Sequence, residues 1–139
     1  MKNITYKINT IPELEKIVNL YQAVEWGHKD YPEMLQIAYA NSEYIVCAYH
    51  QEELIAIGRA ISDKSFTVYF PDLLVHPDWQ RKGIGRQIMS MMLDKFEDFH
   101  NIVLTAEDER ARSFYLMMGF KSQPFGMSID NSFKEIKKF

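Results

Sequence analysis

The chain has 139 residues, of which 47% are hydrophobic and 25% charged, and its formal net charge is −3. These values are typical of one globular domain, and no apolar run approaches the roughly 18 residues of a membrane-spanning helix. The mildly acidic balance, with only short basic clusters, disfavours nucleic-acid binding. The single cysteine, Cys47, excludes an intrachain disulfide and favours a reducing, cytoplasmic location.

The first third of the chain predicts a short strand followed by two helices. "TYKI", residues 5–8, reads as the strand. From Pro12 to Val24, apolar residues recur at helical spacing, and proline suits the first turn of a helix. "GHKD", residues 27–30, ends this helix, and "YPEMLQIAYAN", residues 31–41, predicts a second one.

Three strands are predicted in the middle of the chain. Residues 44–50 and 54–61 are rich in apolar and β-branched side chains, and the polar "QEE" between them indicates a hairpin. Cys47 lies within the first of these strands, where a thiol behaves as a small buried hydrophobe. Residues 65–75 form the third strand, in which Pro71 predicts a bulge or a break in pairing.

The last part of the chain again alternates helices and strands. A long helix is expected over 83–99, a strand over 102–105 and a short helix over 111–119, and weak strands are expected near Phe120 and Phe133. No internal repeat or linker divides the chain, so residues 1–139 are predicted to form one domain. The element order predicts an α/β fold in which helices cover both faces of a mixed sheet.

One turn interrupts this core-building pattern with two glycines and two cations. "WQRKGIG", residues 79–85, joins the end of a strand to the start of the long helix. A helix N-terminus presents unpaired N–H groups to an anion, and glycines allow phosphate to approach the backbone. A Walker A loop does not fit because Lys82 precedes Gly83, and a dinucleotide fingerprint needs glycine where Ile88 stands. The residues alone leave a plain glycine-containing loop as the alternative.

The spacing Gln80-x-x-Gly83-x-Gly85 resembles the acyl-CoA signature of the GNAT acetyltransferase superfamily, Gln/Arg-x-x-Gly-x-Gly/Ala. "DLLVHPDWQRKGIGRQIM" is similar to the family's strand, bulge, loop and helix. "ARSFYLMMGF" resembles its second motif, Ala-x-x-Phe-Tyr-x-x-x-Gly-Phe. The resemblance covers essentially the whole chain and is greatest to small single-domain bacterial members. It implies the GNAT fold, with a mixed, mostly antiparallel central sheet.

The resemblance implies acetyl-CoA as the cosubstrate. Backbone N–H groups from Arg81 to Arg86 would hold the pyrophosphate, and a Cβ at either glycine of the loop would intrude on it. The strand 73–75 would pair with the pantetheine arm, and the N–H of either Leu73 or Leu74 would polarise the acetyl carbonyl. The residues implied at the cofactor are Leu73, Leu74, Val75, Gln80, Arg81, Lys82, Gly83, Ile84, Gly85, Arg86, Asp108, Phe114 and Tyr115.

Two side chains are the candidates for catalysis. Tyr115 would donate a proton to the departing thiolate, because an ordinary phenol with a pKa of about 10 stays protonated at neutral pH. The alternative role for Tyr115 is a core aromatic beside Phe114. Asp72 would be the general base for the amine, or it would make a structural hydrogen bond. Asp108 stands where the family often has asparagine, a departure that leaves its contact with the cofactor arm open.

The acceptor would bind near residues 25–31. Trp26, His28 and Tyr31 are the candidates there, with Arg59 and Asp63 facing them across the sheet. Trp26 would be either a hydrophobic lid or a core plug. The four histidines have no metal-ligand spacing, so no metal is predicted.

The sequence therefore predicts a cytoplasmic N-acetyltransferase that transfers acetyl from acetyl-CoA to a primary amine of a small molecule or peptide. Transfer would be direct, within a ternary complex. The alternative is a non-catalytic acyl-CoA-binding sensor with a GNAT-like fold. We expect neither nucleic acid nor membrane as a partner, and family habit allows a homodimer.

Overall fold

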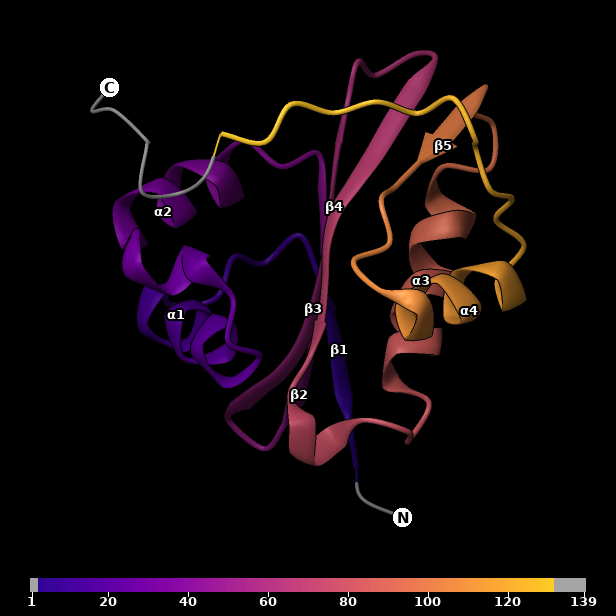
Figure 1. Cartoon of the computed structure of the whole chain (residues 1–139). Helices are drawn as coiled ribbons and strands as arrows, with labels where there is room; N and C mark the ends of the chain where they lie inside the picture. The colour runs from indigo at the N-terminus through magenta and orange to yellow at the C-terminus, as the bar shows by residue number, and fades with distance from the viewer. Residues whose placement is uncertain (1–2, 132–139) are drawn as a thin grey trace. The chain divides into compact units, whose positions relative to one another are not determined.

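Figure 1 shows the computed structural model, which describes residues 3–131. Its internal contacts form two compact units, one up to Thr105 and one from Ala106 onward, and each unit is described by itself. The prediction of one domain stays a prediction.

A five-stranded sheet dominates the first unit. Its strands lie in the order of the sequence, and all neighbours are antiparallel except β4 and β5, which are parallel. This confirms the predicted mixed, mostly antiparallel sheet. The strands are β1 (Thr5–Ile8), β2 (Tyr44–His50), β3 (Glu53–Ser62), β4 (Thr67–Val75) and β5 (Asn101–Val103).

Helices cover both faces of this sheet, as predicted (Figure 1). The helices α1 (Leu14–Ala23) and α2 (Pro32–Ala40) lie on one face and α3 (Ile84–Lys95) on the other. The predicted break at "GHKD" is a short 3₁₀ helix, η1 (Gly27–Asp30). Pro32 begins α2, because its fixed φ suits a first helical turn that needs no N–H donor. The long helix ends earlier than predicted, with Phe96 as its C-cap.

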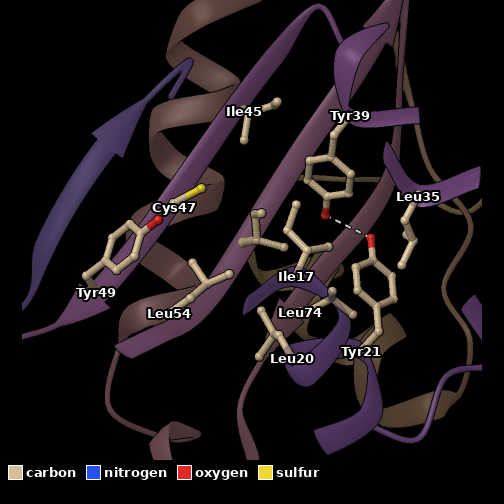
Figure 2. Close-up of a cluster of buried hydrophobic side chains, with 11 residues drawn as sticks. Ile17, Leu20, Tyr21, Leu35, Tyr39, Ile45, Cys47, Tyr49, Leu54 and Leu74 are labelled. Carbon is tan, nitrogen blue, oxygen red and sulfur yellow. Dashed lines mark hydrogen bonds between the residues drawn. The ribbon is translucent and has the colours of Figure 1, made fainter. Parts of the chain in front are cut away.

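The core on the α1/α2 face is a continuous cluster of buried side chains, drawn in Figure 2. It confirms Cys47 as a buried strand residue, and burial raises the pKa of its thiol to about 12. The cluster consists of Ile17, Leu20, Tyr21, Leu35, Tyr39, Ile45, Cys47, Tyr49, Leu54, Ile57 and Leu74.

On the opposite face, α3 approaches β3 closely at Gly58. A Cβ at this position would lie 2.7 Å from both Ile88 Cγ2 and Met92 Sδ. Only glycine, which has no side chain, allows α3 to pack this closely on β3. This contact positions α3, the helix that begins at the glycine-containing turn, on the sheet.

A bulge in β4 confirms the irregularity predicted at Pro71. The β3–β4 register shifts between the pairs Arg59–Asp72 and Ile61–Tyr69. Within the bulge, Phe70 packs against Phe96 at 6.0 Å between ring centroids, and after it Asp72 contacts α1 on the other face. The extra residue thus turns Asp72 toward α1 and α2.

The second unit contains the helix α4 (Glu109–Met117). Gly119, with a φ of 104°, ends it in the left-handed region that favours glycine. The strand predicted near Phe120 is wrong: Phe120 N–H donates to Tyr115 O at 3.0 Å and so closes the helix end instead of pairing in a sheet. The strand predicted near Phe133 lies outside the described residues.

Candidate active site

The turn after β4 is anchored to the strand and to the core. Gln80 Nε2 donates to Val75 O at 3.0 Å, and Trp79 is buried with its ring 4.8 Å from that of His50. His76 Nδ1 accepts from Asp78 N at 3.1 Å at the start of the 3₁₀ helix η2 (Pro77–Trp79). The turn is therefore a fixed structure, and His76 has the local backbone role that its place before proline indicates.

Two left-handed residues shape the loop that follows. Arg81 has a φ of 62° and Gly83 a φ of 85°, and Gly83 is the N-cap of α3. Gln87 N donates to Gly83 O, so the N–H groups of residues 84–86 precede the first bond of the helical ladder. The first turn of α3 carries no acidic residue. This helix start combines available donors with the positive end of the helix dipole.

The two glycines of the loop have different surroundings. A Cβ at Gly83 would meet no protein atom within 4 Å, whereas one at Gly85 would lie 3.4 Å from Val75 Cγ2. No packing contact thus requires glycine at position 83, where the positive φ favours it and the space outside the backbone is open to a ligand. Arg81, Lys82 and Arg86 are exposed. The loop consequently fits a polyanion such as a pyrophosphate.

Beyond the bulge, β4 pairs with β3 along one edge, and its other edge pairs with no further strand of the residues described in the first unit. Among the residues described in the first unit, β5 pairs only with Thr67–Tyr69 of β4. His76 N–H donates to Ile55 O at 2.8 Å, which fixes the phase of the antiparallel ladder. The alternation of that ladder directs the Leu74 N–H toward β3 and those of Leu73 and Val75 away from it. Of the two predicted carbonyl donors, the geometry favours Leu73.

Asp72 lies in a buried polar network, of which the sequence singled out Asp72 and Arg59 but not the contact between them. Arg59 Nε donates to Asp72 Oδ2 at 2.6 Å, and Tyr21 OH donates to the same oxygen at 2.8 Å. Tyr39 OH lies 2.8 Å from Tyr21 OH (Figure 2), and Arg59 Nη1 donates to Ser42 Oγ at 3.4 Å. Tyr21 and Tyr39 were missed because tyrosines at apolar helical positions are typical of a core.

The charge states of this network follow from burial. Burial raises the pKa of both Tyr21 and Tyr39, which remain neutral donors. Burial lowers the pKa of Arg59, but the Asp72 carboxylate raises it, and the net shift is upward. Oδ2 of Asp72 already accepts two hydrogen bonds, one of them from the Arg59 cation. The arrangement favours the structural alternative for Asp72.

The predicted acceptor residues partly come together beside this network. The His28 ring lies 5.1 Å from that of Tyr21, and the Trp26 ring lies 5.7 Å from His28. Tyr31 is the N-cap of α2 and donates its N–H to His28 O at 3.0 Å. Burial lowers the pKa of His28, so its imidazole is largely neutral near pH 7.

Asp63 has a defined role in the turn between β3 and β4. Its Oδ1 accepts hydrogen bonds from the backbone N–H groups of residues 65–67 in the β3–β4 turn. These bonds explain why the pKa of Asp63 is lowered. Aspartate is frequent in such turns for this reason. The role of Asp63 toward the acceptor stays a prediction.

The remaining candidates belong to the second unit. Asp108 Oδ1 accepts from Ala111 N at 2.8 Å and is the N-cap of α4, a role that explains aspartate at a position where the family often has asparagine. Tyr115 has the rings of Phe114 and Phe120 at 5.4 and 5.8 Å. Their roles toward a cofactor stay predictions.

Residues 3–131 contain no group of three or more His, Cys, Asp or Glu side chains placed to hold a metal ion. No helix among these residues has the length and apolar character needed to cross a membrane.

Comparisons with known proteins give the family. The sequence model of the acetyltransferase (GNAT) family matches residues 11–120. The chain is 29% identical over 131 residues to the uncharacterized N-acetyltransferase ycf52 of Gracilaria tenuistipitata var. liui. The aligned region covers 90% of this chain and 71% of that protein.

Solved structures agree. A GNAT family acetyltransferase from Streptococcus pneumoniae TIGR4 is 32% identical with a TM-score of 0.80, covering 94% of this chain and 100% of that one. A probable acetyltransferase from meticillin-resistant Staphylococcus aureus shares the fold at 23% identity, with a TM-score of 0.82 over 92% of this chain and 99% of that one. With the family matched from the first helix to the end of α4, the chain belongs to the acetyltransferase (GNAT) family.

Proposed function

We propose that the protein is an acetyl-CoA-dependent N-acetyltransferase that acetylates a primary amine of a small molecule or peptide. The observation that carries the proposal is the β4–α3 junction. There, beyond the bulge, an edge of β4 that pairs with no other strand among residues 3–131 leads into an anchored loop. This loop has two left-handed residues and open space at Gly83, and the first helical turn after it carries no acidic residue. Family membership supports acetyl transfer in general.

The loop would hold the pyrophosphate chiefly through backbone groups. The N–H groups of residues 81–86 supply directed donors, and the exposed side chains of Arg81, Lys82 and Arg86 supply positive charge. The outward N–H and C=O groups of the 73–75 edge would then pair with the amides of the pantetheine arm. Val75 O already accepts from Gln80, which leaves the N–H of Val75 for the cosubstrate.

Chemistry at the thioester needs an electrophile, a nucleophile and a leaving group. The Leu73 N–H would polarise the acetyl carbonyl as the amine attacks, so that the C–N bond forms and the C–S bond breaks. Tyr115 would donate its phenolic proton to the departing thiolate, and the proton that the attacking nitrogen loses as the amide forms would return to Tyr115 through water. The acceptor ammonium must first lose its proton, and water is the acceptor we propose because Asp72 is engaged by Arg59 and Tyr21.

Transfer would be direct and not through an acetyl-cysteine. Cys47 is fully buried in β2, and burial raises the pKa of its thiol to about 12, so little thiolate is present near pH 7. A cytoplasmic location is also part of the proposal, and the use of a single cysteine, with no intrachain disulfide possible, supports it. A homodimer is part of the proposal, and light scattering tests it.

A thiol-release assay tests the function. Purified protein with acetyl-CoA is screened against polyamines, amino acids, aminoglycosides, arylalkylamines and lysine-containing peptides, with a Gly83→Glu variant as the matched control. Release of CoA that depends on one acceptor class and disappears in the variant supports the enzyme. Tight binding of acetyl-CoA without turnover on any acceptor would support the sensor instead.

A further inference from the structure

We propose that Tyr21 is a positioning residue for acetyl transfer: its hydroxyl holds the Asp72 carboxylate and thereby orients the Leu73 N–H toward the acetyl carbonyl. The proposal rests on the proposed function and adds a residue that neither the sequence motifs nor the comparisons assign. Tyr21 is fully buried on α1, 51 residues away from Asp72 in the chain.

The hydrogen bonds around Tyr21 have a defined direction. A phenol has one proton, and the carboxylate paired with Arg59 can only accept, so the Tyr21 proton points to Asp72 Oδ2 at 2.8 Å. Tyr39, whose hydroxyl lies 2.8 Å from that of Tyr21, must then be the donor in their bond (Figure 2). Tyr39 on α2 therefore donates to Tyr21 on α1, and Tyr21 donates to Asp72 on β4.

Asp72 is the point at which this network meets the reacting backbone. The N–H of Leu73 belongs to the peptide plane that joins it to Asp72, so holding the Asp72 side chain limits rotation of that plane. On the other side of Asp72, Pro71 has no N–H and the register with β3 is broken. Strand pairing begins again only at the Arg59–Asp72 pair, and the side-chain bonds to Asp72 reinforce this restart.

Tyr21 also contacts two of the residues that are candidates for binding the acceptor. Its ring lies 6.0 Å from that of Trp26 and 5.1 Å from that of His28. One residue thus contacts the loop after α1 and the strand after the bulge. The pyrophosphate loop is held separately, through the Gln80–Val75 bond. We therefore expect Tyr21 to influence turnover and carbonyl polarisation without changing the affinity for acetyl-CoA.

The test compares Tyr21→Phe with a matched control, Tyr49→Phe. Both remove one hydroxyl from the same buried cluster, in which Tyr49 lies well away from Tyr21 (Figure 2). Two readouts are used: steady-state kinetics with the best acceptor from the screen, and isotope-edited infrared spectra of [1-¹³C]acetyl-CoA bound without acceptor. Circular dichroism and thermal unfolding verify that each variant is folded.

For Tyr21→Phe we expect kcat to fall about tenfold, less than when an oxyanion donor itself is removed, while KM for acetyl-CoA stays unchanged. The carbonyl band of the bound thioester should move toward its position for free acetyl-CoA. Tyr39→Phe leaves Asp72 its Tyr21 donor and should shift the band less, in the same direction. Tyr49→Phe should leave kcat and the band unchanged.

A wild-type kcat and an unmoved band in folded Tyr21→Phe would overturn the proposal, as would a loss of acetyl-CoA affinity with an unmoved band. If Tyr21→Phe does not fold, an unmoved carbonyl band in folded Tyr39→Phe would overturn the proposal instead. A wild-type band identical to that of free acetyl-CoA would contradict the role of Leu73 in the proposed function, and this proposal with it. Failure of the proposed function is thus visible in the wild-type protein, before any variant is measured.

Discussion

Arg59 and Asp72 form a buried ion pair between directly opposed residues of β3 and β4, with 2.6 Å between Nε and Oδ2. The Asp72 side chain is 3% exposed and that of Arg59 11%. Removing only the cation would leave a buried carboxylate without its counter-charge. Arg59→Met should therefore destabilise the protein by about 3 kcal/mol or more.

Urea unfolding followed by fluorescence measures this change, and the double variant Arg59→Met/Asp72→Leu is its control. With both charges replaced by apolar side chains, most of the lost stability should return, although Tyr21 then lacks its acceptor. Equal destabilisation of the single and double variants would show that packing at Arg59, and not charge, is what the single change removes.

Gly83→Glu should abolish binding of acetyl-CoA. The substitution places a side chain and a negative charge in the space outside the loop, and its φ of 85° is unfavourable for any residue with a Cβ. Calorimetric titration measures the affinity, and Gly83→Asn, which tolerates the left-handed region better, separates backbone strain from charge. Unchanged affinity in a folded Gly83→Glu variant would contradict the pyrophosphate assignment.

Arg81→Ala should weaken acetyl-CoA binding only modestly, by about 0.5–2 kcal/mol, because backbone groups make most of the proposed contacts. Alanine meets the same backbone constraint as arginine at the φ of 62°, so the loop should keep its shape. The measurement is a titration at two salt concentrations. Complete loss of binding in a folded variant would show that the side chain dominates.

Lowering the pH should destabilise the protein in part through His28. Burial lowers its pKa in the folded state, so the unfolded state binds more protons, and the contribution is complete above the unfolded pKa of about 6.5 and is lost as the pH falls below it. In His28→Gln, the free energy of unfolding should fall less between pH 7.5 and pH 5.5 than in the wild type. Identical slopes in urea titrations at several pH values would exclude His28 as a source.

The sequence was sufficient for those features that local chemistry determines. Pro71 predicted the bulge, and the glycine spacing predicted the loop at the start of α3. Runs of apolar and β-branched residues on either side of a polar turn predicted β2 and β3. Each of these follows from a few adjacent residues. The strand expected near Phe120 is wrong because the Phe120 N–H donates to Tyr115 O at the end of α4.

The Tyr21–Asp72 contact could not be predicted in this way. In the sequence, Tyr21 is one more apolar position of an amphipathic helix, and nothing local shows that its hydroxyl reaches a carboxylate on β4. Only the packing of α1 on the sheet and the bulge that turns Asp72 toward it bring the two groups together. The choice between Leu73 and Leu74 likewise required the phase of the β3–β4 ladder.

Tyr115→Phe removes one hydroxyl and keeps the ring that contacts Phe114 and Phe120 within the second unit. If the phenol protonates the departing thiolate, kcat should fall by about 10²-fold or more. KM for acetyl-CoA should barely change, because the lost interaction matters mainly in the transition state. Steady-state kinetics with the acceptor from the screen measures both, and thermal unfolding should show unchanged stability because the aromatic volume is conserved.

A raised KM with unchanged kcat would mean that the hydroxyl only tethers the cosubstrate in the ground state. Full activity on both measures would make Tyr115 a packing residue and leave the thiolate to be protonated by water.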